Sequence, residues 1–183
     1  PFPACNLVVE PDGVSLYGPT TSISYRELEG RGWAVGALLR PAGAGALCSP
    51  SLIRNSHRPL EDSDLKVAVA SAMADTNTTT GGQRAASALA AWVAQHTGPP
   101  QAMALTANRM EDVVASDRSI LRVDQLARRL DLSIRSLQRL SERYIGLPPL
   151  AVIRRYRLQE AAQRLREDPS VTVAQVAAEL DYA

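Results

Sequence analysis

The chain repeats a short segment fifty residues further on, and this repeat constrains its fold more than any other feature. Residues 123–133, "VDQLARRLDLS", align without a gap with residues 173–183, "VAQVAAELDYA". Five of the eleven aligned positions are identical: Val123/Val173, Gln125/Gln175, Ala127/Ala177, Leu130/Leu180 and Asp131/Asp181. A simple helical bundle has no need to repeat one hairpin, so the repeat indicates two copies of one small helical unit.

The first copy and the residues after it have the pattern of a helix-turn-helix. Apolar residues spaced i, i+3, i+4 and i+7 form one stripe on a first helix: Val123, Leu126, Ala127 and Leu130. A short turn follows, and Ser133 is a good N-cap for a second helix because its hydroxyl can accept a backbone N–H. The second helix should end at Gly146. Its expected inward residues are Ile134, Leu137, Leu140, Tyr144 and Ile145.

The outward face of this second helix carries the candidate chemistry. Arg135, Gln138 and Arg139 are spaced i, i+3 and i+4, so they form one patch. Arginine can bridge guanine O6 and N7, and glutamine can pair with adenine N6 and N7. We therefore predict these three as DNA base-reading residues, since the amino-terminal part of such a helix meets base edges. Glu142, one turn later, is expected to mark where the helix leaves the groove. Solvated arginines on an ordinary helical hairpin are the alternative.

Other polar residues are candidates for contacts with the DNA backbone. They are Ser133, Arg128, Arg129, Arg154 and Arg155. A serine at a helix amino terminus can take a phosphate. The two arginines at 154 and 155 form a dense basic run with Arg157, for which exposure or ion pairs within the chain are equal alternatives.

Basic charge is concentrated in the C-terminal part of the chain. Residues 1–116 hold 8 Lys and Arg against 10 Asp and Glu, whereas residues 117–183 hold 12 against 9. Between Arg118 and Arg157 there are ten arginines and three acidic residues. Such a distribution is expected of a nucleic-acid-binding module, with a solvated helix face as the alternative.

A long helix is predicted between the two copies. "PLAVIRRYRLQEAAQRLREDP" suits a helix of about 20 residues, roughly 30 Å long, which would hold two DNA-reading units about one duplex turn apart. Asp168 and Pro169 should end it, and Thr172 can cap the next helix. Its expected inward residues are Val152, Tyr156, Leu158, Ala162 and Leu165.

These motifs resemble a known family over roughly residues 105–183. "LARRLDLSIRSLQRLSERYIGLPPLAVIRRYRLQEAAQRL", followed by "VTVAQVAAELDYA", is similar to the DNA-binding domain of AraC-type transcriptional regulators. The "LS.R.LQR", "G.PP" and "RYRL..A" motifs recur in register. The resemblance implies two helix-turn-helix units joined by a long helix, each with a recognition helix in the major groove, and it places Arg135, Gln138 and Arg139 at the base-reading positions of the first unit.

The resemblance fails at the end of the chain. In that family a segment similar to "DQAHFIRDF" follows "GY" and forms the second recognition helix, whereas this sequence ends at "LDYA", with Asp181 where glycine is usual. We therefore expect an incomplete second unit, as a fragment or as a truncated gene product, with fraying from Thr172. The apolar residues expected to be exposed there are Val173, Val176, Ala177 and Leu180.

The N-terminal part is predicted to begin with short strands. "ACNLVVE" and "VSLYG" flank a "PDG" turn, and "SISYREL" alternates apolar and polar residues. "GWAVGALLRP" suggests a strand covered on both faces and ended by Pro41. These four strands favour part of a β-barrel or sandwich. "NLVVEP", "LEGRGWAVGALLRP" and "GAGALC" also resemble, more weakly, the cupin-like N-terminal region of one AraC-type subgroup.

From Asp62 the pattern becomes helical, in "DSDLKVAVASAMAD" and "QRAASALAAWVAQH". The expected fold class is mixed α and β: a partial, cupin-like β region followed by an all-α helix-turn-helix DNA-binding domain. The expected parts are a β-rich sensor or dimerisation-like region (1–60), a helical connector (61–100) with a polar linker (76–82), and an AraC-type helix-turn-helix domain (101–183). The "TGPP" stretch, with two prolines and a glycine, marks the last boundary.

Few residues suggest any other chemistry. Cys5 and Cys48 make neither a disulfide framework nor a zinc cluster, so we predict partly buried free thiols in a reducing compartment. His57 and His96 are isolated, and residues 1–60 do not offer the metal-binding set of cupin enzymes. We therefore expect no enzyme activity, no metal and no cofactor. No apolar stretch reaches the roughly 20 residues that span a bilayer, so a cytoplasmic protein without membrane contact is expected.

The predicted function is a sequence-specific DNA-binding transcription regulator that reads the major groove with residues 133–144. Its expected partner is double-stranded DNA. A small-molecule effector bound through the N-terminal region and a homodimer are left open. The alternative function is a truncated remnant without DNA binding, acting as a ligand-binding or dimerisation module.

Overall fold

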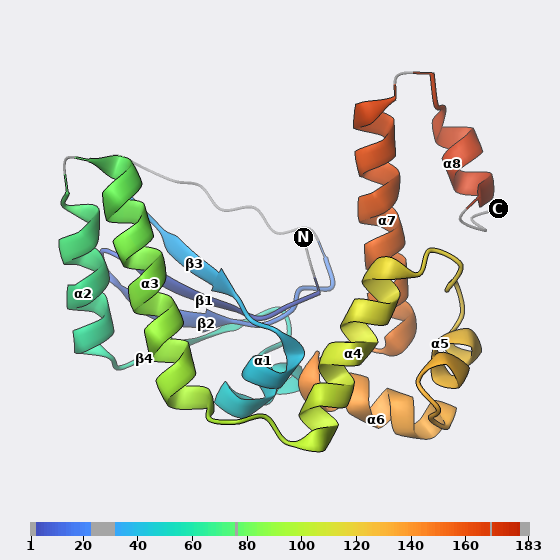
Figure 1. Cartoon of the computed structure of the whole chain (residues 1–183), viewed down its shortest axis with the longest axis horizontal. Helices are drawn as coiled ribbons and strands as arrows, with labels where there is room; N and C mark the ends of the chain where they lie inside the picture. The colour runs from blue at the N-terminus through green and yellow to red at the C-terminus, as the bar shows by residue number, and fades with distance from the viewer. Residues whose placement is uncertain (1–2, 23–31, 76, 169, 180–183) are drawn as a thin grey trace.

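The computed structural model describes residues 3–22, 32–75, 77–168 and 170–179. Two groups of elements are arranged side by side (Figure 1): a sheet with two helices on it, and a cluster of helices that leads to the C-terminus. The first group comprises β1 (Asn6–Glu10), β2 (Gly13–Tyr17), β3 (Val35–Leu38), α1 (Pro41–Leu47), the 3-10 helix η1 (Pro50–Ile53), β4 (His57–Leu60), α2 (Ser63–Met73) and α3 (Thr78–Thr97). The second comprises α4 (Ala102–Ser116), α5 (Val123–Arg129), α6 (Ile134–Tyr144), α7 (Pro149–Glu167) and α8 (Val173–Glu179).

The strands form one antiparallel sheet in the order β3-β1-β2-β4. The two strands predicted on either side of the "PDG" turn are confirmed, and they form a hairpin, because β1 and β2 pair from Asn6↔Tyr17 to Glu10↔Gly13. Burial alternates along both strands, with Leu7, Val9 and Leu16 fully buried on one face. That alternation is typical of a sheet packed on a single face.

One prediction about the strands is wrong, and one strand was not predicted. The strand expected to be covered on both faces is the edge strand β3, where Leu38 is 58% exposed. The other edge strand, β4, lies in a segment for which no strand was predicted, and it contains Pro59. An edge strand tolerates proline, since the missing N–H can fall on the side without a neighbour.

The expected barrel or sandwich is not seen in the described part of the chain, where the strands form one sheet covered by helices. The predicted strand "SISYREL" lies, apart from its first residue, outside the described residues. The overall class is mixed α and β, as predicted.

Helices α2 and α3 cover the buried face of the sheet (Figure 1) and share a core with it. This core includes Leu7, Leu16, Val69, Ala85 and Leu89. The two helices therefore belong to the packed N-terminal unit.

The polar linker predicted at residues 76–82 is helical from Thr78 onward. Asn77 caps α3 by accepting the Thr80 N–H at 3.1 Å. Gly81 is buried, and a Cβ atom there would lie 2.6 Å from the Ala72 carbonyl oxygen. The glycine thus lets α3 approach α2 closely. Its presence, which suggested a linker in the sequence, is explained by this contact between two helices.

The α3–α4 connection coincides with the predicted "TGPP" boundary, where Gly98 has a φ of +59°. A second core begins after it and includes Met110, Leu126, Leu137 and Val152. Ala42 of α1 also joins this second core, so the N-terminal unit is docked on the helical unit.

The long helix is confirmed as α7, which is 19 residues long, but part of its predicted inward stripe is wrong. Leu158 is 64% exposed, whereas the buried positions of α7 are Pro149, Val152, Ile153, Arg157 and Ala161. The side that faces inward is set by the position of α4, and it includes an arginine that an apolar pattern does not find.

Helix α8 corresponds to the repeated segment. Thr172 caps it as predicted, since its hydroxyl accepts the Gln175 N–H at 3.2 Å. Val173 is 71% exposed, as expected, but Val176 is only 3% exposed, so its predicted exposure is wrong. Ala177 is half-buried. Leu180 lies outside the described residues.

Candidate nucleic-acid interface

Helices α5 and α6 form the predicted helix-turn-helix. Their inward residues Leu126, Ala127, Leu137 and Leu140 are at most 3% exposed. The turn contains Asp131 with a φ of +55°, a left-handed conformation that aspartate tolerates better than most residues. The turn is closed by the Leu132 N–H, which donates to the Ala127 carbonyl at 2.9 Å.

Both ends of α6 are as the sequence predicts. The Ser133 hydroxyl accepts the Ser136 N–H at 3.1 Å, which makes it the N-cap. The helix ends before Gly146, which has a φ of +80°, and the Gly146 N–H donates to the Ser141 carbonyl at 2.9 Å. A Cβ atom at this glycine would lie 2.6 Å from the Pro50 carbonyl carbon, so η1 packs directly against the end of α6.

The three predicted base-reading residues share the exposed face of α6. Arg135, Gln138 and Arg139 are exposed, and none forms a hydrogen bond or ion pair with any described residue. Ile134, expected to face inward, is instead 47% exposed at the start of the same helix. The exposure of Ile134 could not be predicted from helical spacing, because Ile134 is the first residue of α6 and its surroundings depend on the turn before the helix.

Glu142 is held by the N-terminal unit. The Arg54 guanidinium forms an ion pair with Glu142 at 2.5 Å and donates through Nε to the Gly146 carbonyl at 2.7 Å. The last turn of α6 is therefore attached to the segment after η1. The expectation that Glu142 marks the end of a DNA-facing surface stays a prediction, but its carboxylate now has a local partner.

Three of the backbone candidates are exposed arginines. Arg128 pairs with Asp124 at 2.9 Å, and Arg129 lies 3.8 Å from Asp117. Such exposed ion pairs are weak, about 0–1 kcal/mol, so both side chains can exchange partners. Arg154 is exposed on α7 and has no polar partner within the described ranges.

Arg155 and Arg157 are directed into the protein. Arg155 donates to the Thr20 carbonyl. Arg157 is 2% exposed, donates to the Val114 carbonyl, and forms an ion pair with Glu160 at 3.0 Å. Burial lowers the pKa of both arginines from the ordinary value, and Glu160 opposes that shift at Arg157. Of the residues predicted to contact the DNA backbone, Arg155 is thus the one whose side chain is directed into the protein.

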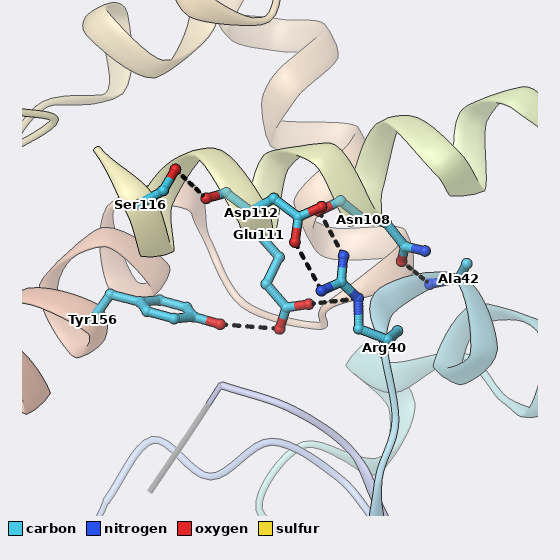
Figure 2. Close-up of polar contacts among 7 residues, drawn as sticks. All are labelled: Arg40, Ala42, Asn108, Glu111, Asp112, Ser116 and Tyr156. Atoms are coloured by element: carbon cyan, nitrogen blue, oxygen red, sulfur yellow. Dashed lines mark hydrogen bonds and ion pairs between the residues drawn. The ribbon is translucent and has the colours of Figure 1, made fainter. Parts of the chain in front are cut away.

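A polar network joins the N-terminal unit to α4 and α7 (Figure 2). Arg40 forms ion pairs with Glu111 at 3.2 Å and Asp112 at 2.8 Å. The Tyr156 hydroxyl donates to Glu111 at 3.0 Å. Burial raises the pKa of Glu111 above its ordinary value, although Tyr156 and Arg40 favour the charged form. This network fastens the segment after β3 to α4, and through Glu111 to α7.

The repeated glutamine has the same role in both copies. Gln125 accepts the N–H groups of Leu121 and Arg122 at 2.9 and 2.8 Å. Gln175 accepts the Thr172 N–H at 2.8 Å. Each glutamine satisfies N–H groups at the start of its helix, which is the reciprocal half of a capping box.

The geometry is that of a helix-turn-helix with an open, arginine-bearing second helix. Residues 126–183 match the family model of a helix-turn-helix domain of the AraC type. The match supports a DNA-binding transcription regulator, and it concerns a regulatory rather than a catalytic domain. No curated protein and no solved structure matches the chain.

Among the described residues, no helix is both long and apolar enough to cross a membrane. In the same ranges, no cluster of three or more His, Cys, Asp or Glu side chains could hold a metal ion. Cys5 and Cys48 are free thiols, one buried and one partly buried.

Proposed function

We propose that this protein is a sequence-specific transcription regulator that inserts the amino-terminal half of α6 into the major groove of double-stranded DNA. Arg135, Gln138 and Arg139 contact base edges there. The observation that carries the proposal is that these three side chains share one exposed face and are free of polar partners among the described residues. Side chains that are already unpaired lose no internal bond when they bind a base.

The surroundings of α6 support this orientation. Ile134 is exposed beside Arg135, and an apolar side chain at this point can contact a thymine methyl group. At the other end, Arg54 pairs with Glu142 and η1 packs against Gly146, so the last turn of α6 contacts the N-terminal unit. The amino-terminal half of the helix is the part that carries unpaired polar side chains among the described residues.

The DNA backbone is contacted by residues that flank α6. Arg128, Arg129 and Arg154 are exposed. To reach a phosphate, Arg128 and Arg129 give up only a weak ion pair each, and Arg154 gives up none with a described residue. Ser133 and the first N–H groups of α6 can take a further phosphate. Arg155 is excluded from this set, because it donates to the Thr20 carbonyl.

The test is a fluorescence-anisotropy titration with a duplex that the chain itself selects from a random-sequence library. Arg139→Ala is expected to weaken binding by about 1–3 kcal/mol and to relax the preference at one base pair. Arg84→Ala is the matched control, since Arg84 is an exposed arginine that pairs with Asp75. It belongs to α3, which lies in the sheet unit, whereas α6 lies in the helical unit (Figure 1). It should leave the affinity unchanged.

Steep salt dependence by itself does not support the proposal, because non-specific binding has it too. Equal, weak binding of selected and random duplexes by the wild type would exclude sequence-specific reading. It would favour the alternative, a ligand-binding or dimerisation module without DNA binding. A single helix-turn-helix module buries only about 600–1,000 Å² on DNA, so we also propose that a homodimer supplies a second contact.

We further propose that a small effector binds at the junction of the two units. A cavity of about 280 Å³ is lined there by α1, the α3–α4 connection and Arg143 and Tyr144 of α6. A ligand in this cavity would touch the end of the DNA-reading helix. An effector that changes DNA affinity should lose its effect when Arg143 is replaced by alanine.

A further inference from the structure

The two units enclose a cavity of about 280 Å³, whose walls come from α1, the α3–α4 connection, the start of α4 and the end of α6. These elements meet where the sheet unit joins the helical unit (Figure 1), and α1 contacts both α4 and α6 there. The chemistry of the walls indicates which class of effector the cavity takes.

The cavity is open because the residues that α1 contributes to it are small. They are alanines and glycines, among them Ala42, Gly43 and Gly45. Gly45 lies against the ring of Tyr144, where a Cβ atom would be 2.4 Å from the ring, so this glycine brings α1 onto α6. At Gly43, in contrast, a Cβ atom would meet no heavy atom within 4 Å. The space beside Gly43 is therefore unfilled by the described residues.

Arg143 is the one charged residue among the described residues that line the cavity. Its guanidinium lies beside the ring of Tyr144, with Cζ 5.4 Å from the ring centroid. It forms no hydrogen bond or ion pair with any described residue. The contact with the ring can orient the guanidinium, but it leaves the N–H donors without acceptors. A wall with one unpaired cation and no carboxylate favours an anionic ligand.

The start of α4 adds to the positive potential of the cavity. Gln101 and Ala104 line it, and the Gln101 side chain does not cap the helix. The first N–H groups of a helix have no acceptor within the helix, and the helix dipole is positive at that end. Pro99, Pro100 and the alanines make other parts of the wall apolar. The cavity therefore combines a cationic part with an apolar part.

We propose that this cavity binds a small monocarboxylate with a compact apolar body. The carboxylate pairs with Arg143, whose planar guanidinium can donate two parallel N–H bonds to it. The apolar body lies against α1, the two prolines and Tyr144. The volume is at the lower end of the range for ligand sites, about 300–1,000 Å³, so the ligand has few non-hydrogen atoms.

The position of the cavity links it to the helix-turn-helix. A ligand that contacts α1 and the end of α6 at once stabilises the arrangement in which the two units are docked. It touches the last turn of the helix whose first turns carry Arg135, Gln138 and Arg139. An effect of the ligand on DNA affinity rests on the proposed function, whereas binding of the ligand does not.

The test measures binding of small probes to the 183-residue chain by NMR titration, without DNA. The probes are cyclohexanecarboxylate and pentanoate. Cyclohexanecarboxamide and cyclohexylmethylamine are the matched neutral and cationic compounds, and inorganic phosphate is an anion without an apolar body. A carboxylate should bind with a dissociation constant on the order of 0.1–1 mM, as its size allows, and at least about tenfold more tightly than the other three compounds. Absence of binding by both carboxylates, or equal binding of the amide, the amine or phosphate, would overturn the proposal.

Variants locate the site. Arg143→Ala should weaken carboxylate binding at least about tenfold, because a charge-assisted hydrogen bond is lost, and Arg143→Lys should recover part of it. Gly43→Leu should abolish binding, because its side chain enters the unfilled space without a clash at Cβ. Arg139→Ala is the matched control, since Arg139 is an exposed, unpaired arginine one turn earlier on α6 that does not line the cavity, and it should bind as the wild type does. Wild-type binding by Arg143→Ala would place the carboxylate elsewhere and overturn the proposal, whatever Gly43→Leu shows.

The link to DNA is measured separately. A saturating concentration of the carboxylate should change the affinity of the wild type for its selected duplex, and the change should be absent in Arg143→Ala. An unchanged affinity of the saturated wild type would overturn the regulatory role. Arg139→Ala should lose DNA affinity and still bind the carboxylate, so failure of the DNA reading and failure of the ligand site give different results.

Discussion

Helices α6 and α7 follow each other in the chain and both carry several arginines, yet they use them differently. On α6, Arg135 and Arg139 are exposed and unpaired among the described residues. On α7, Arg155 and Arg157 donate to backbone carbonyls of other segments, and Arg157 is 2% exposed. An arginine-rich sequence therefore contains both surface arginines and structural ones.

The difference comes from what each helix packs against. The inward face of α6 is apolar apart from Ser141, which donates to the Leu147 carbonyl, so its arginines can only lie outward. Helix α7 instead crosses the C-terminal end of α4, where the last carbonyls have no partner within their own helix. Arg157 supplies a donor to one of them, that of Val114.

The largest expected effect is at Arg157. Replacement by alanine should lower the free energy of unfolding by about 3 kcal/mol, because it leaves a cavity and removes one of the two ion-pair partners of Glu160 and the donor to the Val114 carbonyl. Urea denaturation measures the change. Arg154→Ala on the same helix is the control and should stay within about 0.5 kcal/mol. Equal losses for the two variants would remove the distinction between buried and exposed arginines on α7.

A smaller effect is expected at the start of α6. Ser133→Ala should cost about 1 kcal/mol of stability, since the Ser136 N–H loses its acceptor. Helix α7 begins after Pro148 without a side-chain cap, so Pro148→Ala should cost less. Ser133→Asp should keep the cap but weaken DNA binding, because its charge would face the phosphates. Undiminished DNA affinity in that variant would place the start of α6 away from the DNA backbone.

The smallest change is expected at Arg155. Arg155→Met should alter the free energy of unfolding by no more than about 1 kcal/mol, because burial already disfavours the charge and Nη1 is buried without a partner among the described residues. DNA affinity should not change. Arg154→Ala, in contrast, should reduce the salt dependence of DNA binding by about one phosphate contact. If both variants showed the same salt dependence of DNA binding, Arg154 and Arg155 would not differ in their contact with DNA, and the inward orientation of Arg155 would have no effect on binding.

Local signals predicted most of the helical part. The spacing of Leu126, Ala127 and Leu130, the cap at Ser133 and the stop at Gly146 depend only on neighbours in the chain. The same holds for the turn between β1 and β2. The missed features need contacts between distant segments: the strand β4 with its proline, the glycine that brings α3 to α2, and the inward Arg157.

The candidate site follows the same division. The exposure of Arg135, Gln138 and Arg139 could be predicted, because helical periodicity assigns each side chain to one side of α6 once the apolar side is known. The exposure of Ile134 and the pairing of Glu142 with Arg54 were not, since they depend on the turn geometry and on a segment 88 residues away.

By itself, the sequence determined a helix-turn-helix, its boundaries and the side on which its polar residues lie, because hydrogen bonding and periodicity act over a few residues. Only the tertiary structure decided which arginines stay exposed and which are turned into the protein. It also decided that the N-terminal unit holds the end of α6 through Arg54. Those outcomes require segments distant in sequence to pack against one another, and no local pattern contains that information.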